Sequence, residues 1–169
     1  PTSAYSWEVA SFDGSKITAS NGMTATIKPA TDNLRSAEFV FILGSWGTEH
    51  YRNPKLTAWL RKRARAGERI CGVELGSYIV ARAGLLDGKS ATIHWSWLNG
   101  FKENFDRVEV EESLFTLDSK VMTCSGGLAG VDLMLRIIEE INGSSFSGEI
   151  ADQMLHHPIR SATSPQRST

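Results

Sequence analysis

Three loops of this chain place polar or aromatic residues directly after a predicted buried strand and before a predicted helix. They contain Gly44-Ser45-Trp46, Glu74-Leu75 and Ser125-Gly126, and His94-Trp95 follows a shorter predicted strand. In wound α/β sheets, ligands bind where strands end and helices begin. We therefore predict one ligand-binding site, formed by Gly44, Ser45, Trp46, Glu74, Leu75, His94, Trp95, Ser125 and Gly126.

Recognition of a cation is the chemistry that these residues offer. A carboxylate at a helix N-terminus, as predicted for Glu74, is stabilised by the helix dipole, but in a cleft it also needs a partner. The chain has 5 tryptophans, and an indole face attracts an ammonium group by about 0.5 to 2 kcal/mol. One interpretation makes Trp46 and Trp95 walls of the site. The other assigns the tryptophans to the core or to an interface, as we expect for Trp7 and Trp59.

The cysteines and histidines suggest no catalysis and no metal. Cys71 lies inside an apolar strand, where a neutral thiol is inert, and Cys124 ends a strand near the predicted site, where a packing role is expected. His94 either lines the site or holds its loop through a backbone hydrogen bond. His156 and His157 are expected at an exposed helix end. No histidine has partners at metal-ligand spacing, so we predict no metal and no cofactor.

The apolar patterns predict an α/β fold around these loops. Uninterrupted apolar runs at 38–43 and 68–73 are typical of strands covered on both faces, as in a parallel sheet. Asn53 as N-cap, Pro54 at the first helical position and Gly67 at the end delimit a helix. Further strands are expected at 5–12, 91–93, 108–110, 114–117 and 121–124, a hairpin at 16–27, and helices up to 83, at 129–141 and at 147–157. Strands that alternate with helices predict a wound, mostly parallel sheet flanked by helices.

Size and charge limit the functions that the chain can have. Its 169 residues suit one domain, and a formal net charge of -1 argues against direct binding to nucleic acid. Residues 160–169 lack an apolar pattern, so we expect a domain at 1–158 and the start of a linker at 159–169. Few cysteines, no membrane-length apolar run and no signal-peptide pattern predict a cytoplasmic protein.

Three stretches resemble one family. The first runs from Ile70-Cys71-Gly72-Val73-Glu74-Leu75-Gly76 to Ala83-Gly84-Leu85-Leu86-Asp87-Gly88 and Ala91-Thr92-Ile93-His94-Trp95. The others are Thr123-Cys124-Ser125-Gly126-Gly127 and Ala151-Asp152-Gln153-Met154-Leu155. Together they resemble the class I glutamine amidotransferase-like, ThiJ/PfpI-like domain of AraC-family transcription regulators, and within that group the regulators of quaternary-amine and amino-acid catabolism.

This resemblance implies a flavodoxin-like fold, a homodimer, and a domain that senses a small amine, quaternary ammonium or amino-acid metabolite. It also implies that the family's first strand is absent from this chain, and that DNA is bound through a C-terminal helix-turn-helix domain that is missing. Glu74 takes the nucleophile position, which is cysteine in the enzymes of the superfamily, so no catalytic residue is expected.

Two other functions stay open at this point. One is a PfpI-like hydrolase or lyase, which would require thiol-dependent turnover. The other is a dimerisation module that binds no ligand and whose cleft around Glu74 is filled by side chains.

Overall fold

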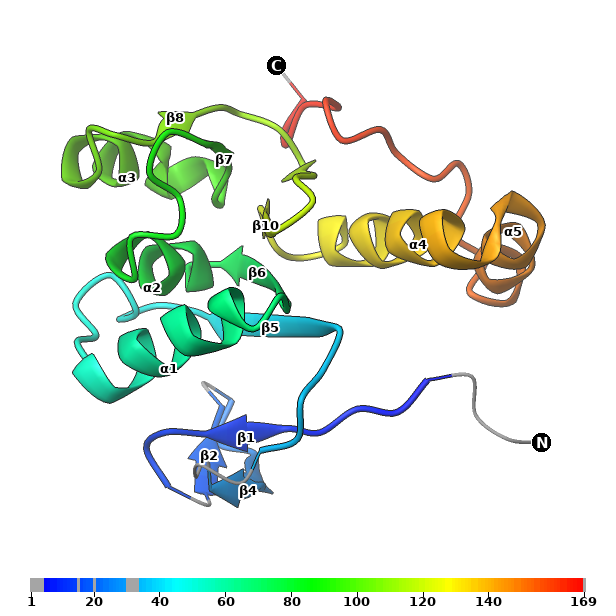
Figure 1. Ribbon diagram of the computed structural model, residues 1–169. Coiled ribbons are helices and arrows are strands. Elements are labelled where there is room, and N and C mark those ends of the chain that lie inside the picture. Colours follow the sequence, from blue (N-terminus) through cyan, green and yellow to red (C-terminus); the bar gives the residue numbers. More distant parts are fainter. Residues whose placement is uncertain (1–4, 15, 20, 30–33, 169) are drawn as a thin grey trace. The chain divides into compact units, whose positions relative to one another are not determined.

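The computed structural model describes residues 5–14, 16–19, 21–29 and 34–168 (Figure 1). Contacts within the chain divide it into residues 1–36 and residues 37–169, and the two units are described separately. The predicted boundary between a domain and a linker at 158/159 remains a prediction.

The first unit contains short strands only. β2 (Lys16–Thr18) and β3 (Thr24–Thr26) pair antiparallel, as the sequence predicted for a hairpin around Asn21-Gly22. Gly22 has a φ of +83°, which favours glycine, and the Asn21 side chain accepts a hydrogen bond from the amide of Met23. β1 (Ala10–Ser11) pairs in parallel with β4 (Lys28–Pro29).

The prediction of a long half-buried strand at 5–12 is wrong for most of that segment. Only Ala10–Ser11 forms a strand, because its partner β4 offers two residues for pairing. Trp7 is 82% exposed, so of the two expected positions, core or interface, the core is ruled out for the described chain.

The second unit is built on a four-stranded sheet with the order β5-β6-β10-β9. β5 (Phe39–Gly44), β6 (Arg69–Glu74) and β10 (Val121–Cys124) run parallel, and β9 (Phe115–Thr116) pairs antiparallel with β10. The register places Gly44 beside Glu74 and Cys124 beside Val73. The predicted wound, mostly parallel α/β sheet is confirmed.

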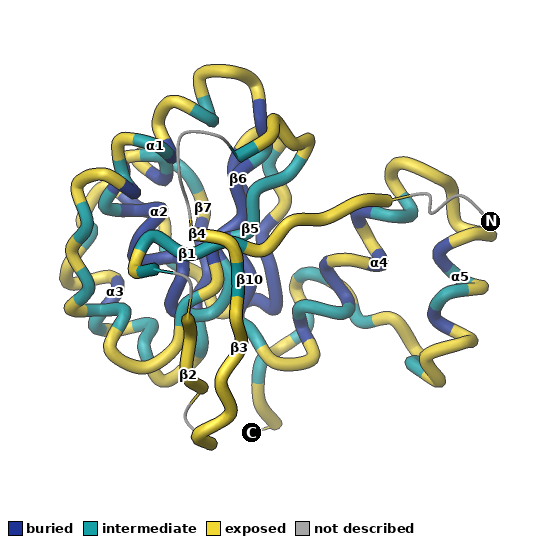
Figure 2. Tube along the Cα trace, turned by 90° about the horizontal axis from the view of Figure 1, so that it is seen from below, coloured by how far each residue is buried: buried dark blue, intermediate teal, exposed yellow. Residues whose placement is uncertain are grey.

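Helices cover both faces of this sheet (Figure 1). α1 (Pro54–Arg65) and α2 (Gly76–Arg82) lie on one side, and α4 (Ala129–Asn142) lies on the other. β6 alternates accordingly, since Cys71 joins the apolar cluster under α4, whereas Gly72 approaches Ser77 in α2. Figure 2 shows that the buried positions concentrate in β6 and β10, as expected for strands at the centre of a sheet.

Helix α1 follows its sequence signals closely. Asn53 is the N-cap, its side-chain oxygen accepts from the amide of Leu56 at 3.1 Å, and Pro54 begins the helix. Gly67 follows the C-terminus with a φ of +92°. Leu56 and Leu60 are buried, and they pack the helix onto the sheet.

The region after α2 contains short strands close to two of the predicted ones, and a helix that was not predicted. β7 (Ser90–Ala91) pairs in parallel with β8 (Glu109–Val110), and a short 3-10 turn at Trp95–Trp97 leads into α3 (Leu98–Asn104). No helix was predicted at 98–104, because Gly100 and four polar residues leave only Leu98 and Phe101 as apolar positions. Phe101 is fully buried and its ring lies 5.0 Å from the ring of Tyr78, so tertiary packing stabilises this helix.

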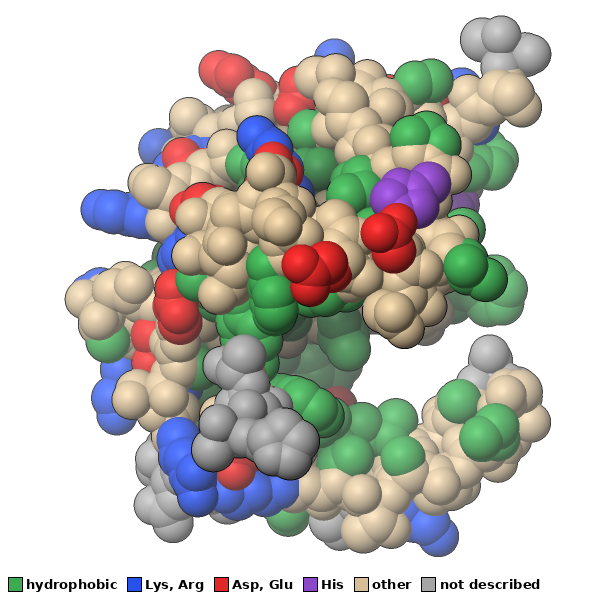
Figure 3. Space-filling model, turned by 90° about the vertical axis from the view of Figure 1, so that its right-hand side faces the viewer, with side chains coloured by type: hydrophobic (Ala, Val, Ile, Leu, Met, Phe, Trp, Pro, Cys, Tyr) green, Lys and Arg blue, Asp and Glu red, His purple; other side chains and the backbone are tan. Residues whose placement is uncertain are grey.

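The last helix is also shifted. α5 spans Ser144–Gln153, so His156 and His157 lie beyond its end rather than in it. His157 is exposed and pairs with Asp152, Nε2 to Oδ1 2.6 Å; on the side of the molecule where α5 lies, Figure 3 shows a histidine next to an acidic side chain. For His156, the prediction of an exposed position is wrong, because its side chain is only 19% exposed and contacts a buried aspartate.

That aspartate, Asp132 in α4, holds the segment after α5. Its side chain is 0% exposed, and it accepts from His156 Nε2 at 2.8 Å and from the amide of Arg160 at 2.9 Å. The guanidinium of Arg160 adds two bonds, of 2.9 and 2.6 Å. Hydrogen bonds from His156 and Arg160 hold the pKa of Asp132 below its usual range, against the effect of burial.

We expect Asp132→Asn to lower the free energy of unfolding by about 1 to 2 kcal/mol. Hydrogen bonds to a charged group can contribute more than this, but Arg160 is partly exposed and solvent weakens its interaction with Asp132. A lowered folded-state pKa stabilises the fold above the unfolded-state value of about 3.9, and that stabilisation is lost as the pH falls through the folded-state pKa. In urea titrations, the difference between wild type and variant should therefore shrink below about pH 4. Asp152→Asn, whose carboxylate is 71% exposed, is the control and should have little effect. An equal difference at every pH would contradict this assignment.

Candidate functional site

The turn between β6 and α2 is the centre of the predicted site. Glu74 ends β6 with a φ of +54°, a left-handed conformation that non-glycine residues rarely adopt. α2 begins two residues later, at Gly76. This is the geometry of a nucleophile elbow, a sharp turn that exposes one side chain between a strand and a helix. The structure thus places Glu74 at the sharp turn between β6 and α2, and its assignment to the nucleophile position stays a prediction.

Two glycines allow this tight turn to pack against β5. A Cβ on Gly76 would lie 1.9 Å from the carbonyl oxygen of Ile42, and a Cβ on Gly44 would lie 2.5 Å from the amide nitrogen of Gly76. Because both distances are far inside van der Waals contact, only glycine fits at either position. Gly44 therefore permits the close approach of the backbone, and its part in ligand binding stays a prediction. Leu75, beside Glu74, is 0% exposed and packs in the core.

The loop after β10 covers the other side of Glu74. Gly126 has a φ of +92°, and a Cβ there would lie 2.8 Å from the Cβ of Glu74. Ser125 is buried, and its amide donates to the carbonyl of Leu114 at 2.8 Å. The structure brings Gly44, Glu74 and Gly126 together, as predicted from their positions at the ends of adjacent parallel strands.

The carboxylate of Glu74 has no partner within the described part of the chain. It is partly buried, and among the described residues it forms neither an ion pair nor a side-chain hydrogen bond. A partly buried carboxylate without a partner costs free energy that a bound cation or hydrogen-bond donor would offset.

The loop after β5 places its polar and aromatic residues differently. The amide of Ser45 donates to the hydroxyl of Thr48 at 3.1 Å, which closes the turn. Trp46 is 80% exposed, so its indole lies largely in solvent in the described chain. Its predicted role as a wall of the site is untested.

His94 holds its own loop. Its Nδ1 accepts from the amide of Ser96 at 3.4 Å and lies 2.8 Å from the Ser96 hydroxyl. Of the two roles that the sequence left open for His94, the structure shows the backbone hydrogen bond. Its ring also contacts that of Trp95, with centroids 5.4 Å apart.

Trp95 already has a cation on its indole face. The guanidinium carbon of Arg167 lies 5.1 Å from the Trp95 ring centroid, and Arg167 also pairs with Glu112 at 3.3 Å. The sequence pointed to an ammonium group at this tryptophan, and the structure places a side chain of the same chain there. Trp95 is 43% exposed.

Next to Arg167, the side chain of Gln166 enters the domain. Its Nε2 donates to the Thr92 hydroxyl at 3.0 Å and to the carbonyls of Ile93 and Ser113 at 2.9 and 2.8 Å. Its Oε1 is buried without a hydrogen-bond partner. Neither Gln166 nor Arg167 was predicted as a site residue, because nothing in a polar segment without apolar pattern indicates where it folds back.

Both thiols are buried on the side of the sheet that α4 covers. Cys71 and Cys124 are each 0% exposed and belong to one apolar cluster with Met122 and Leu133. Burial raises the pKa of the Cys71 thiol far above its usual range and that of Cys124 to about 11, although the amide of Gly126 donates to the Cys124 sulfur. Neither thiol is poised as a nucleophile.

The described residues contain no group of three or more potential metal ligands. No described helix is long and apolar enough to cross a membrane.

Comparison with known proteins agrees with this geometry. The sequence profile of the DJ-1/PfpI family matches residues 3–140. The HTH-type transcriptional regulator CdhR of Pseudomonas aeruginosa is 35% identical over 163 residues, which are 96% of this chain and 48% of the regulator. The chain thus spans about half the length of the curated regulators that it matches. Isonitrile hydratase of Pseudomonas putida is 25% identical, over 84% of this chain and 62% of that enzyme.

Solved structures share the fold. An AraC family transcriptional regulator from Pseudomonas putida superposes with a TM-score of 0.83 at 19% identity, over 90% of this chain and 83% of that one. DJ-1 of Toxoplasma gondii superposes with a TM-score of 0.73 at 22% identity, over 89% of this chain and 83% of that one. The predicted flavodoxin-like fold and ThiJ/PfpI-like resemblance are confirmed, and the chain belongs to the DJ-1/PfpI family.

Proposed function

We propose that this chain is the effector-binding domain of an AraC-family transcription regulator, that it binds a small amine, quaternary ammonium or amino-acid metabolite, and that it has no catalytic activity. The regulators that it matches support the general role. In this proposal the effector-binding domain forms a homodimer. DNA is bound by a separate helix-turn-helix domain of the regulator.

Glu74 is the observation that carries the proposal. The elbow presents a carboxylate where a nucleophilic enzyme needs sulfur or oxygen with a nearby base. The same carboxylate, partly buried and unpaired among the described residues, attracts an ammonium group. An elbow that holds an acid is therefore suited to binding a cationic metabolite rather than to cleaving a bond.

The contacts of the last residues suggest how binding is transmitted. Arg167 lies on the indole of Trp95, and Gln166 is bonded to the backbone that leads into His94. An ammonium group that binds against Trp95 competes with the Arg167 guanidinium for the same ring. Ligand binding would thereby weaken the attachment of the segment after α5, to the extent that the ligand prefers the released state.

We expect Glu74→Gln to weaken the binding of glycine betaine, carnitine or arginine by about tenfold or more, because a charge-assisted contact contributes roughly 1.5 to 3 kcal/mol. The substitution keeps the size of the side chain. Tryptophan fluorescence and melting temperature would be followed during titration, with Glu149→Gln, at an exposed position of α5, as control. If none of the three compounds shifts either signal of the wild type, the proposed ligand class is wrong.

The cysteines separate a sensor from a thiol enzyme. With a pKa of about 11, Cys124 is ionised in about one molecule in a thousand at pH 8, so iodoacetamide should leave the native protein unlabelled. In urea, mass spectrometry should find both cysteines labelled. Raising the pH toward 11 should accelerate the labelling of Cys124 first. A thiol that reacts rapidly in the native protein would favour the PfpI-like hydrolase or lyase.

If Arg167 and the ligand compete for Trp95, removing the arginine should strengthen ligand binding, whereas Glu74→Gln should weaken it. Arg167→Gln removes the internal cation and should tighten betaine binding about threefold, since an exposed cation–π contact contributes about 0.5 to 1 kcal/mol. Arg65→Gln, at an exposed position of α1, is the control. Affinity that is unchanged or weaker in Arg167→Gln would show that ligand and Arg167 do not compete.

A further inference from the structure

A second site lies beyond the C-terminal end of α2, away from Glu74. It is a cavity of about 410 Å³ between the start of α1, the last turn of α2 and the end of α3. Its volume is within the range of small-molecule sites, about 300 to 1,000 Å³. Glu74 and the other predicted site residues are not among those that line it.

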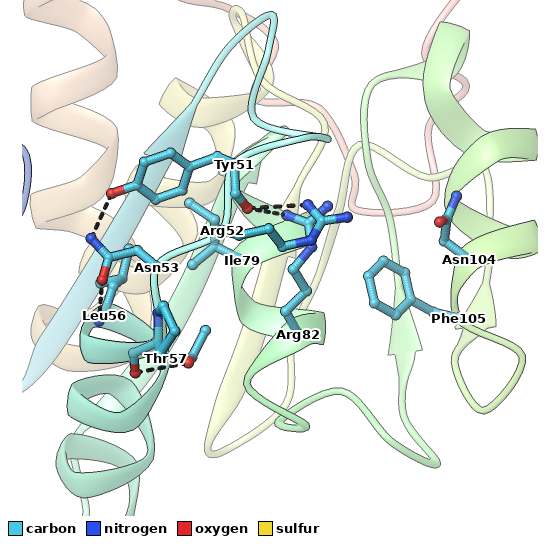
Figure 4. Close-up of a pocket in the computed structure, with 10 residues that line it drawn as sticks. Tyr51, Arg52, Asn53, Leu56, Thr57, Ile79, Arg82, Asn104 and Phe105 are labelled. Atoms are coloured by element: carbon cyan, nitrogen blue, oxygen red, sulfur yellow. Dashed lines mark hydrogen bonds between the residues drawn. The ribbon is translucent and has the colours of Figure 1, made fainter.

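Two arginines give this cavity its charge. Arg52 and Arg82 both donate to the carbonyl of Tyr51, at 3.2 and 3.1 Å, so their guanidinium groups lie side by side (Figure 4). Arg82 also donates to the carbonyls of Thr48 and Glu49, and Arg52 to that of Glu49. These acceptors are neutral carbonyls. The Glu49 carboxylate and the ring of Tyr78, whose centroid lies 5.2 Å from the Arg82 guanidinium carbon, offset part of the Arg82 charge.

Among the described residues, neither guanidinium forms an ion pair, and no acidic residue lines the cavity. The carboxylate of Glu49, which does not line the cavity, accepts from the amide of Gly47 at 2.9 Å and lies 3.7 Å from His50. Burial and the neighbouring Arg52 lower the pKa of Arg82. Two adjacent positive charges are stabilised by an anion between or beside them.

The rest of the cavity has an apolar surface with one amide. Phe105 and Asn104 face the arginines across the opening (Figure 4), and Ile79 and Leu56 contribute aliphatic surface. Asn104 donates to the carbonyl of Gly100 at 2.6 Å. A ligand that fits this lining carries an anionic group at one end and an apolar or flat body at the other.

We infer that this cavity binds a small organic carboxylate, with the carboxylate at Arg52 and Arg82 and the apolar body against Phe105. Guanidinium groups bind carboxylates through charge-assisted hydrogen bonds, and Arg52 retains Nε and Nη2 for this purpose. Arg82, whose bonds already connect α2 to residues 48–51, supplies mainly charge and position. This site is additional to the proposed amine site and does not depend on it.

Calorimetric titration with benzoate, benzamide and inorganic phosphate tests the inference. Benzoate should bind with one site per chain, whereas benzamide, which has the same shape without the charge, should not. Phosphate should bind more weakly than benzoate, because it has no body for Phe105. Equal binding of benzoate and benzamide, stronger binding of phosphate, or no binding of benzoate would overturn the inference.

Variants locate the binding. Arg52→Gln should weaken benzoate about tenfold, and Arg61→Gln, at an exposed position of α1, should not. Asn104→Asp places a negative charge across the cavity without changing either arginine and should also weaken it. Both variants should melt within a few degrees of the wild type. Glu74→Gln should leave benzoate binding unchanged, and loss of benzoate binding in that variant would assign it to the elbow instead.

Discussion

The close approach of three backbone segments at Glu74 is the constraint on which this structure depends. The Ile42 carbonyl touches Gly76, the Gly126 loop touches Glu74, and Glu74 itself has a positive φ. Such a conformation costs about 1 to 3 kcal/mol for a residue that is not glycine, and it persists only where the surroundings determine it. Here parallel strands on either side of β6 determine it, because their ends bring the loops to the same edge of the sheet.

The backbone around residue 74 fixes where its side chain lies, whereas the type of that side chain decides what chemistry it can do. The elbow holds whatever side chain occupies residue 74 between two glycine-containing loops, at the N-terminal end of a buried helix. A thiol in such a position would be activated as a nucleophile. A carboxylate is stabilised by the same helix end but gains no reactivity from it, since it is already ionised. The family fold is therefore compatible with both enzymes and binding domains, and the proposed function depends on one residue.

The segment after α5 is attached to the rest of its unit mainly by polar contacts. Asp132, fully buried, binds Arg160, and six residues later Gln166 bonds to three groups around Thr92. Between them the amide of Leu114 donates to the carbonyl of Ala162. Most of these contacts are polar, although Ala162 also packs against the apolar cluster under α4. A segment held in this way is suited to release by competition at one or two contacts.

Much of the fold followed from the sequence because its local signals agreed with the tertiary structure. The apolar runs of β5 and β6, the Asn53 cap and the Asn21-Gly22 turn are each encoded within a few residues. The helix at 98–104 was missed because it depends on the contact of Phe101 with Tyr78, which is remote in sequence. The positions of Glu74 and Gly126 were predicted because each directly follows a strand that the local sequence indicates. The contact of Arg167 with Trp95 was not predicted, because it joins residues that are remote in sequence.

Helix α2 connects the two sites proposed for this chain. Its seven residues, Gly76–Arg82, span about 10 Å at 1.5 Å per residue, with Glu74 just before its first turn and Arg82 in its last. An acid at the N-terminal end and a base at the C-terminal end is the arrangement that the helix dipole favours. Contact of Gly76 with the Ile42 carbonyl leaves α2 almost no room to move toward β5. Because the effect of the helix dipole on a charge falls off within the first or last turn, and α2 is held in place, we expect the two sites to bind their ligands independently of each other.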